Sequence, residues 1–223
     1  DVGCGIGGSS RWMAKCFPDA EVLGITLSPA QVKRATELAK EQGLTNVKFQ
    51  VTDALNTKFE DDTYDLVWGC ESGEHMPDKK KYIEEMTRVL KPGGNWVMAT
   101  WCEREPQPPF TVEERKTLNF VYEEWAHPYF ISIEAYEQLV KGTGVMEKVV
   151  TEDWVDRTLP SWRHSIWVGL WSPWYVLKTS LKNPPAFIGF IRDAYTLERY
   201  HRAMKRGLLK YGMFKATKAQ KAY

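Results

Sequence analysis

The 223-residue sequence predicts an α/β domain built on a doubly wound, mostly parallel sheet. Short β-rich segments alternate with helical segments from residue 1 to about residue 155, as in parallel βαβ units. The chain also opens on a glycine-rich turn, with a helix expected from Ser9 onward. In doubly wound sheets such a turn follows a strand near the centre of the sheet.

Four strands and two further helices are expected in residues 21–101. The strands are short apolar runs at Glu21–Thr26, Val47–Val51, Asp65–Gly69 and Asn95–Trp101. One helix, Pro29–Gln42, ends at Gly43. The other, Lys79–Leu90, has apolar residues at helical spacing and ends before Lys91-Pro92-Gly93-Gly94.

Residues 111–217 differ in character. Helices are expected at Thr111–Trp125 and Ser132–Lys141, and strands at Val145–Trp154 and Leu208–Thr217. Antiparallel neighbours at a sheet edge need only a short turn, so the long connection between these two strands is an insertion, with a helix expected at Pro185–Arg206. The chain therefore divides into a core (1–154), a helical cap (155–207) and a last strand with a basic tail (208–223).

Composition excludes several classes of protein. Hydrophobic residues make up 43% and charged residues 26%, which is typical of a globular domain rather than a disordered chain. A net charge of +1 argues against a nucleic-acid partner. The four cysteines show no C-x-x-C spacing, which predicts no metal site and a reducing compartment. The longest uncharged apolar run, Ser165–Leu177, is too short to cross a bilayer as a helix.

The opening turn, Asp1-Val2-Gly3-Cys4-Gly5-Ile6-Gly7-Gly8, fits the pattern D-x-G-x-G-x-G. Glycines at these positions permit a tight strand-to-helix turn and allow a ligand to lie against bare backbone. The N-terminus of the following helix would then present N–H groups to a carboxylate. A turn without a ligand is the alternative, because a glycine loop alone is weak evidence.

Several motifs accompany this turn. They are Asp1–Ser10 (DVGCGIGGSS), Gly24–Gln31 (GITLSPAQ), Val51–Leu55, Val67–Asp78 (VWGCESGEHMPD) and Thr100–Cys102. With them, over nearly its whole length, the chain resembles the class I S-adenosylmethionine-dependent methyltransferases, and in particular the gamma-tocopherol methyltransferase group. The resemblance implies a seven-stranded sheet, a helical, Trp-rich cap inserted between the last two strands, and S-adenosyl-L-methionine as the cofactor.

The resemblance also assigns cofactor-binding roles to the opening turn and to the second strand. Gly3, Gly5 and Gly7 are expected to face the methionine part of the cofactor, and Asp1 is a further cofactor-binding candidate. At the end of the second strand the superfamily often has an acidic residue that binds the ribose hydroxyls. This chain has Thr26 and Leu27 there instead, and these two residues and Gln31 take over the ribose role.

The next two strands supply the remaining candidates. Asp53 and Ala54 match the adenine site, with a loop cap as the alternative reading of Asp53. Glu71 and Ser72 follow the fourth strand, whose carboxyl end faces the crevice in such sheets.

Glu74 and His75 are the candidate catalytic pair. Histidine titrates near neutrality and is a plausible acid–base group, so His75, or Glu74 acting through water, could remove the proton of a phenol. The alternative is that both residues only cap and orient the loop before the helix Lys79–Leu90.

Five of the ten tryptophans lie within Trp154–Trp174. Tryptophan suits surfaces that are apolar at one end and wet at the other, including membrane interfaces. This segment is interpreted as an apolar wall over the cofactor crevice or as a patch that dips into lipid headgroups, with core packing as the alternative. The candidate substrate or membrane residues are Trp162, Trp167, Trp171 and Trp174.

The end of the chain is basic. Residues 178–223 carry 11 lysines and arginines but only two acidic residues, Asp193 and Glu198. Basic residues beside an aromatic patch favour peripheral contact with an anionic membrane. A merely solvated helix face is the alternative.

The function implied by the resemblance is C-methylation of a lipophilic prenylated phenol or benzoquinol, such as gamma-tocopherol in vitamin E biosynthesis, on a chloroplast envelope or thylakoid surface. One alternative is an N-methyltransferase of a small amine or alkaloid, which would be cytoplasmic. A second is a non-catalytic subunit of a membrane assembly that keeps the methyltransferase fold.

The strand that leads into the glycine turn is represented only by Asp1 and Val2. A sheet that lacks most of its central strand would have unpaired backbone on both flanking strands and an open groove. We therefore expect an upstream segment that supplies about five more strand residues. Helices over the cofactor and, by the resemblance, a plastid-targeting peptide would precede it.

Overall fold

The structure is a computed structural model that describes residues 1–171, Trp174, Lys178 and residues 184–220. Contacts divide the chain into two compact units. The first unit comprises Asp1–Thr100, Glu134–Glu152 and Met213–Tyr223, and the second comprises Trp101–Ile133 and Asp153–Gly212. The second unit therefore contains residues 101–133 in addition to the segment expected as a cap.

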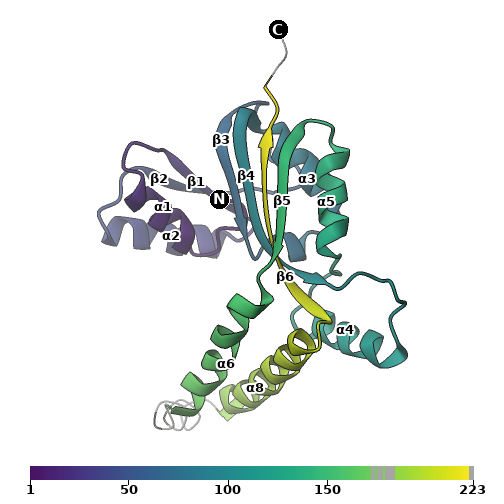
Figure 1. The fold of residues 1–223 in the computed structure, drawn as a ribbon. Helices are drawn as coiled ribbons and strands as arrows, with labels where there is room; N and C mark the ends of the chain where they lie inside the picture. The colour runs from purple at the N-terminus through teal and green to yellow at the C-terminus, as the bar shows by residue number, and fades with distance from the viewer. Residues whose placement is uncertain (172–173, 175–177, 179–183, 221–223) are drawn as a thin grey trace. The chain divides into compact units, whose positions relative to one another are not determined.

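The first unit contains the alternating strands and helices that the sequence predicts (Figure 1). In chain order they are α1 (Gly8–Cys16), β1 (Val22–Thr26), α2 (Pro29–Glu41), β2 (Val47–Val51), β3 (Tyr64–Cys70), η1 (Gly73–His75), α3 (Lys79–Arg88), β4 (Leu90–Glu103), α5 (Ile133–Gly142), β5 (Met146–Asp153) and β6 (Leu209–Lys218). Strands β4 and β6 continue into the second unit. The expected elements are confirmed with small shifts at their ends, except for β4 and the unexpected turn η1.

Strand β4 starts earlier than expected. Its pairing with β3 places Tyr64 opposite Leu90 and Leu66 opposite Asn95, so residues 91–94 form a bulge in β4 rather than a turn before it. Gly93 has a φ of 79°, a conformation that glycine adopts without steric cost. The helix ends at Arg88 and β4 begins at Leu90, so the expectation that the Lys-Pro-Gly-Gly motif separates the helix from the strand is wrong, and the motif lies inside β4.

The described strands form a two-stranded sheet, β1-β2, and a four-stranded sheet of order β3-β4-β6-β5. The pairs β1–β2 and β3–β4 are parallel. Strand β6 runs antiparallel to β5, because the backbone N–H groups of Ala219 and Trp154 donate to the carbonyls of Val145 and Tyr211, respectively. The expected seven-stranded sheet is thus present only in part.

Val2 joins the two sheets. It forms isolated parallel bridges with Ile25 of β1 and with Gly69 of β3. Its backbone N–H donates to the carbonyl of Trp68 at 2.8 Å, and the N–H of Ile25 donates to the carbonyl of Asp1 at 2.9 Å. Beside this link a cavity of about 320 Å³ separates β1 from β3, with apolar residues of both strands in its lining.

Helices α1 and α2 contact the β1-β2 sheet, whereas α5 packs on the four-stranded sheet (Figure 1). The ring of Tyr136 on α5 lies 5.3 Å from that of Phe214 on β6, and both side chains are fully buried. The ammonium of Lys218 on β6 donates to the carbonyl of Thr87 in the last turn of α3 and to that of Leu90, the first residue of β4. These contacts hold the last strand against the helices of the first unit.

The second unit consists of α4 (Val112–Glu124), α6 (Val155–Trp171) and α8 (Pro184–Lys205), with the adjoining parts of β4 and β6. Helices α6 and α8 follow β5 and precede β6, so the expected insertion between the last two strands is helical. Pro160 lies inside α6, and a proline there disfavours a helix on sequence grounds. None of the helices described is long and apolar enough to pass through a bilayer.

An aromatic cluster forms the core of the second unit. Trp101 contacts the rings of Trp162, Tyr200 and Tyr211 at centroid distances of 4.6 to 5.6 Å. Trp162 and Tyr200 stack with an interplanar angle of 4° and centroids 5.1 Å apart. Edge-to-face and offset pairs of this kind add to the stabilisation that burial of apolar area provides.

Candidate functional site

A pocket of about 340 Å³ lies in the first unit at the carboxyl ends of β1, β2 and β3. Ligands of doubly wound sheets bind at this edge. The residues that line the pocket are Gly3, Gly5, Ile25, Thr26, Leu27, Gln31, Thr52, Asp53, Ala54, Glu71, Ser72, His75 and Met76. Most of the residues predicted from the sequence are therefore brought together, whereas Asp1, Gly7 and Glu74 lie outside the lining.

The three predicted glycines serve different purposes. A Cβ at Gly3 would lie 2.4 Å from the Cβ of Ser72, and a Cβ at Gly7 would lie 2.4 Å from the ring of Phe49. Both positions therefore exclude a side chain because protein atoms occupy the space. A Cβ at Gly5, by contrast, would meet no atom of the described residues within 4 Å. Of the three, Gly5 is the one whose bare backbone opens onto free space in the pocket.

Asp1 fixes the start of α1. Its Oδ2 accepts hydrogen bonds from the hydroxyls of Ser9 and Ser10 at 2.7 and 2.6 Å. These bonds tie the glycine turn to the first turn of the helix, where N–H groups are not paired within the helix. The predicted contact of Asp1 with a cofactor remains a prediction.

At the end of β1, the hydroxyl of Thr26 donates to Oε1 of Gln31 at 2.6 Å. The backbone N–H of Ser28 donates to the Thr26 hydroxyl at 3.3 Å, and the Ser28 hydroxyl caps α2. Because the carboxamide oxygen of Gln31 is an acceptor here, its nitrogen supplies the donors that remain. The exposed side chain of Leu27 adds an apolar surface to this part of the pocket.

After β2 the chain presents Thr52, Asp53 and Ala54 to the pocket. Oδ1 of Asp53 accepts the backbone N–H of Leu55 at 2.8 Å, so the residue does cap its loop, as the alternative reading held. The hydroxyl of Thr52 is buried and has no hydrogen-bond partner among the residues that the structure describes. Because buried polar groups are almost always hydrogen-bonded, we expect a bound ligand or a water to form a hydrogen bond with this hydroxyl.

The loop after β3 turns sharply. Glu71 has a φ of 51°, in the left-handed region, and its N–H donates to the carbonyl of Ala99 on β4 at 2.8 Å. The short helix η1 follows, with the N–H of His75 bonded to the carbonyl of Ser72 at 3.1 Å. One side of this turn lines the pocket and its other side is buried.

Glu74 lies on the buried side. Its side chain is 1% exposed, and its Oε2 accepts a hydrogen bond from the hydroxyl of Thr100 at 2.5 Å. Burial raises the pKa of Glu74 to about 7, against a weaker lowering by the Thr100 hydrogen bond. This placement accords with the alternative in which Glu74 orients the loop.

His75 lies on the pocket side of the turn. Partial burial of its ring, together with the nearby Lys79 cation, lowers the pKa of His75 below its ordinary value. The imidazole is therefore largely neutral at pH 7 and able to accept a proton. Its role in catalysis remains a prediction.

The four candidate tryptophans are placed differently. Trp162 is half-buried and stacks on Tyr200 in the aromatic cluster, which is core packing. Trp174 is 80% exposed. Trp167 and Trp171 lie in α6, but their side chains fall outside the described part of the structure.

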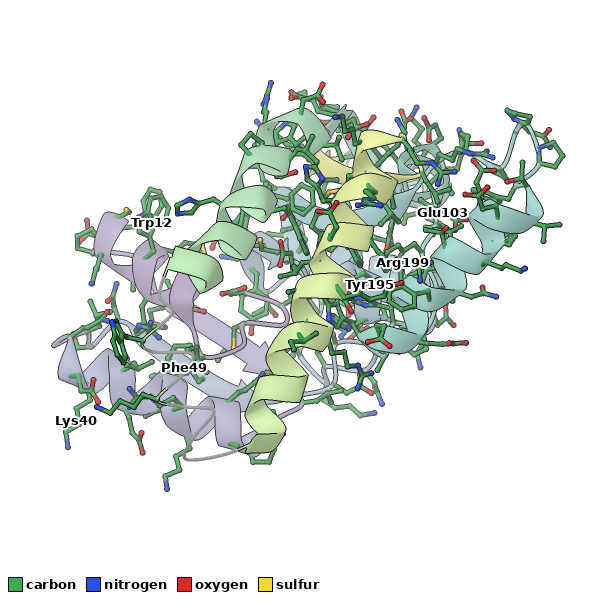
Figure 2. The ribbon with its side chains drawn as sticks, turned by 90° about the horizontal axis from the view of Figure 1, so that it is seen from below. Trp12, Lys40, Phe49, Glu103, Tyr195 and Arg199 are labelled. Atoms are coloured by element: carbon green, nitrogen blue, oxygen red, sulfur yellow. The ribbon has the colours of Figure 1, made fainter. Side chains whose placement is uncertain are left out.

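Basic residues of α8, and Arg206 directly after it, are engaged within the second unit. Arg202 pairs with Glu198 at 2.6 Å, and Arg206 with Glu113 at 3.4 Å. Arg199 lies over the ring of Phe120, 3.9 Å from its centroid, and beside Tyr195 on the same helix (Figure 2). These contacts accord with a helix face that is solvated and internally paired.

Sequence reasoning missed three residues of the pocket lining: Ile25, Thr52 and Met76. Each is the chain neighbour of a predicted residue. Ile25 and Thr52 lie at the carboxyl ends of β1 and β2, and this position was the available signal, because the carboxyl ends of these strands meet at one edge of the sheet. Met76 directly follows η1.

Comparison with known proteins agrees with this geometry. A family model described as a methyltransferase domain matches residues 1–94. A 2-methyl-6-phytyl-1,4-hydroquinone methyltransferase of Synechocystis is 42% identical over 98% of this chain and 67% of that protein. The chain belongs to the S-adenosylmethionine-dependent methyltransferases.

Two further methyltransferases are similar to the chain over nearly its whole length. A chloroplastic tocopherol O-methyltransferase of Arabidopsis thaliana is 39% identical, over 98% of this chain and 62% of that protein. An ajmaline N-methyltransferase of Rauvolfia serpentina is 31% identical, over 98% of this chain and 75% of its own length. The methyltransferase chain thus spans between 62% and 75% of the length of these three relatives.

The fold is that of solved methyltransferases. A geranyl diphosphate C-methyltransferase of Streptomyces coelicolor superposes with a TM-score of 0.75 at 22% identity, covering 98% of this chain and 71% of that one. That structure contains S-adenosyl-L-homocysteine. The pocket of the present chain suits the cofactor of the family. The backbone of Gly5 borders free space, and the buried hydroxyl of Thr52 has no hydrogen-bond partner among the described residues.

Proposed function

We propose that this methyltransferase transfers a methyl group to a ring carbon of a prenylated phenol or benzoquinol, such as gamma-tocopherol. The observation that carries the proposal is the identity of 42% and 39% to enzymes named for a phytylhydroquinone and for tocopherol. The name of the Arabidopsis relative specifies oxygen as the atom that accepts the methyl group. Transfer to a ring carbon is therefore the part of the proposal that most needs a test.

The pocket supplies groups for each part of S-adenosylmethionine. The backbone at Gly5 and the N-terminus of α1 suit the methionine part, because N–H groups at a helix N-terminus favour a carboxylate. Thr26 and Gln31 suit the ribose hydroxyls, and Asp53 with Ala54 suits the adenine. When bound, this cofactor supplies a methyl group on a positively charged sulfur.

His75 is the proposed acid–base group. Its neutral imidazole can accept the proton of a phenol, which makes the ring carbon beside the oxygen more nucleophilic. Glu74 and Thr100 hold the turn that carries it, through their hydrogen bond behind the pocket. The remaining task of the protein is to place the acceptor carbon in line and to exclude water.

A lipophilic substrate resides in membranes, so we include peripheral membrane contact and a chloroplast location in the proposal. Three of the exposed apolar side chains of the second unit, Trp174, Ile191 and Tyr195, would make this contact. Helix α8 carries Ile191 and Tyr195 four residues apart, on one face. Cosedimentation with vesicles of anionic lipid, with and without about 0.5 M salt, separates contact by apolar side chains from contact by charge.

A second candidate is N-methylation of an amine, which the ajmaline N-methyltransferase relative favours. An amine substrate carries a proton that must be lost before transfer, and carboxylates or aromatic faces would bind its cation. Competition between a prenylated quinol and an amine for the same enzyme distinguishes the two candidates. The proposal requires turnover of the quinol and not of the amine.

Binding of the cofactor tests the proposal at its first step. Titration calorimetry with S-adenosylmethionine should show one site per chain. The same titration with the Gly5→Ala variant should show much weaker binding. A protein that keeps its fold and binds no cofactor would support the alternative of a non-catalytic subunit.

A further inference from the structure

Lys79 is the first residue of α3, and its side chain is only 2% exposed. The two lysines that follow it in the sequence, Lys80 and Lys81, are exposed. A buried ammonium loses hydration and is retained only where hydrogen bonds replace the water. Lys79 therefore lies in a different environment from the two lysines that follow it.

The hydrogen bonds of Lys79 go to the turn that carries His75. Its Nζ donates to the carbonyl oxygen of Gly73 at 2.9 Å and to that of Glu74 at 2.8 Å. The carbonyl of Gly73 also accepts the backbone N–H of Met76, at 3.2 Å. The ammonium therefore binds the backbone of η1 from behind, on the side away from the pocket.

Two other contacts hold the same turn. The hydroxyl of Thr100 binds the carboxyl group of Glu74, and the N–H of Glu71 binds the carbonyl of Ala99. Both partners lie on β4, so β4 holds the turn at two points and α3 holds it at a third. A Cβ at Gly73 would lie 2.9 Å from the Thr100 hydroxyl, so the backbone approaches β4 closely here.

From this arrangement we infer that Lys79 is a positioning residue for the cofactor pocket. Its ammonium fixes the carbonyls of Gly73 and Glu74 and thereby sets the place of Ser72 and His75 in the pocket wall. Lys79 does not line the pocket itself and acts only through the turn. The inference rests on the proposed function where it concerns catalysis, but the positioning of the turn is a property of the protein alone.

An apolar residue would fill the same space without the cost of burying a charge. Lys79→Met should therefore leave the protein folded, with a melting temperature near that of the parent. The turn should loosen, so we expect hydrogen exchange at the amides of His75 and Met76 to become about tenfold faster or more. Lys80→Met removes the same charge from the exposed face of the same helix and is the matched control.

The pKa of His75, measured by NMR titration, is the second readout. It should not change if Lys79 only contributes to the stability of the fold. The cation of Lys79 lowers the pKa of His75, so its removal should raise that pKa in Lys79→Met and leave it unchanged in Lys80→Met. The other charged or titratable groups of the turn and of the pocket lining are Glu71, Glu74 and Asp53. Helix α3 adds the buried Tyr82 and the charged residues Lys80, Lys81, Glu84, Glu85 and Arg88.

Both measurements are made without cofactor or substrate, so they stand even if the proposed reaction is wrong. Unchanged exchange and an unchanged His75 titration in Lys79→Met would overturn the inference, whatever the activity. If Lys79→Met does not fold, Lys79→Gln keeps one donor group and is measured in its place. Faster exchange with a raised His75 pKa, together with a lower kcat on a quinol, would support the inference and its link to catalysis.

Discussion

The ring of Phe49 on β2 occupies the space that a side chain at Gly7 would need. A Cβ there would lie 2.4 Å from Cε1 of Phe49, and Gly7 also has a φ of 76°. Gly5, two residues earlier, has a similar backbone with a φ of 54° but has free space beside it. Two glycines of one motif are therefore required for different reasons, one by packing and the other by the ligand space.

Substitution by alanine should separate these two roles. Gly7→Ala forces a methyl group into Phe49 and should lower the free energy of unfolding by about 2 to 4 kcal/mol, from overpacking and backbone strain together. Gly5→Ala should cost only about 1 kcal/mol of stability, from strain, but should weaken cofactor binding by roughly tenfold or more. Chemical denaturation and titration calorimetry measure the two effects.

The control for this pair is Gly8→Ala. Gly8 lies in the first turn of α1, and a Cβ at this position would meet no atom of the described residues within 4 Å, so neither property should change much. Equal losses of cofactor affinity in Gly5→Ala and Gly7→Ala, with equal stability, would contradict the division of roles.

The second prediction concerns Glu74 and pH. Because burial raises its folded-state pKa to about 7, the folded protein holds this proton more tightly than the unfolded chain does. The contribution of Glu74 to stability therefore falls as the pH rises from about 4.5 to about 7, by on the order of 3 kcal/mol, and is level above that range. Denaturation curves across this range should show the decline.

Glu74→Gln keeps an acceptor for the Thr100 hydroxyl but does not titrate. Its stability relative to the parent should rise over the same pH range, by a similar amount. A constant difference between the two proteins at every pH would mean that Glu74 is not the group responsible.

The third prediction concerns the tryptophans of the second unit. Trp162 stacks on Tyr200 and contacts Trp101, so Trp162→Ala should lower the free energy of unfolding by about 2 to 4 kcal/mol. Trp174 is exposed, so Trp174→Ala should change stability by less than about 0.5 kcal/mol. Thermal denaturation of both variants decides whether the two residues differ in this way.

The fourth prediction concerns His75. If its imidazole removes the phenol proton, His75→Gln should lower kcat by about 10² to 10⁴, with a much smaller effect on cofactor affinity. The acidic limb of the rate profile should also disappear in the variant, because the lowered pKa of His75 sets that limb. A kcat within about threefold of the parent would leave His75 with the loop-orienting role alone.

The sequence predicts the elements of the first unit well because their signals are local. The apolar spacing within Lys79–Leu90 predicts α3, which spans Lys79–Arg88, without reference to the rest of the chain. The carboxyl ends of β1, β2 and β3 meet at one edge, and the residues that the resemblance assigned there, Thr26, Asp53 and Glu71, line one pocket.

What the sequence does not show depends on contacts between distant residues. Gly7 meets Phe49 across 42 positions of the chain, and Lys79 differs from Lys80 only through its burial behind η1. The sequence leaves open whether Trp162 belongs to a surface patch or to the core, and the contact that decides it comes from Tyr200 of another helix. No local pattern of residue types distinguishes these positions from their neighbours.

The central claim is the transfer of a methyl group to a ring carbon of a prenylated phenol. The most direct test incubates the enzyme with gamma-tocopherol and S-adenosylmethionine that carries a ¹³C-labelled methyl group. The proposed function predicts a product heavier by one labelled methyl group, whose carbon resonance is that of an aryl methyl. A product with its label on the phenol oxygen, or labelling of an amine but not of gamma-tocopherol, would contradict it.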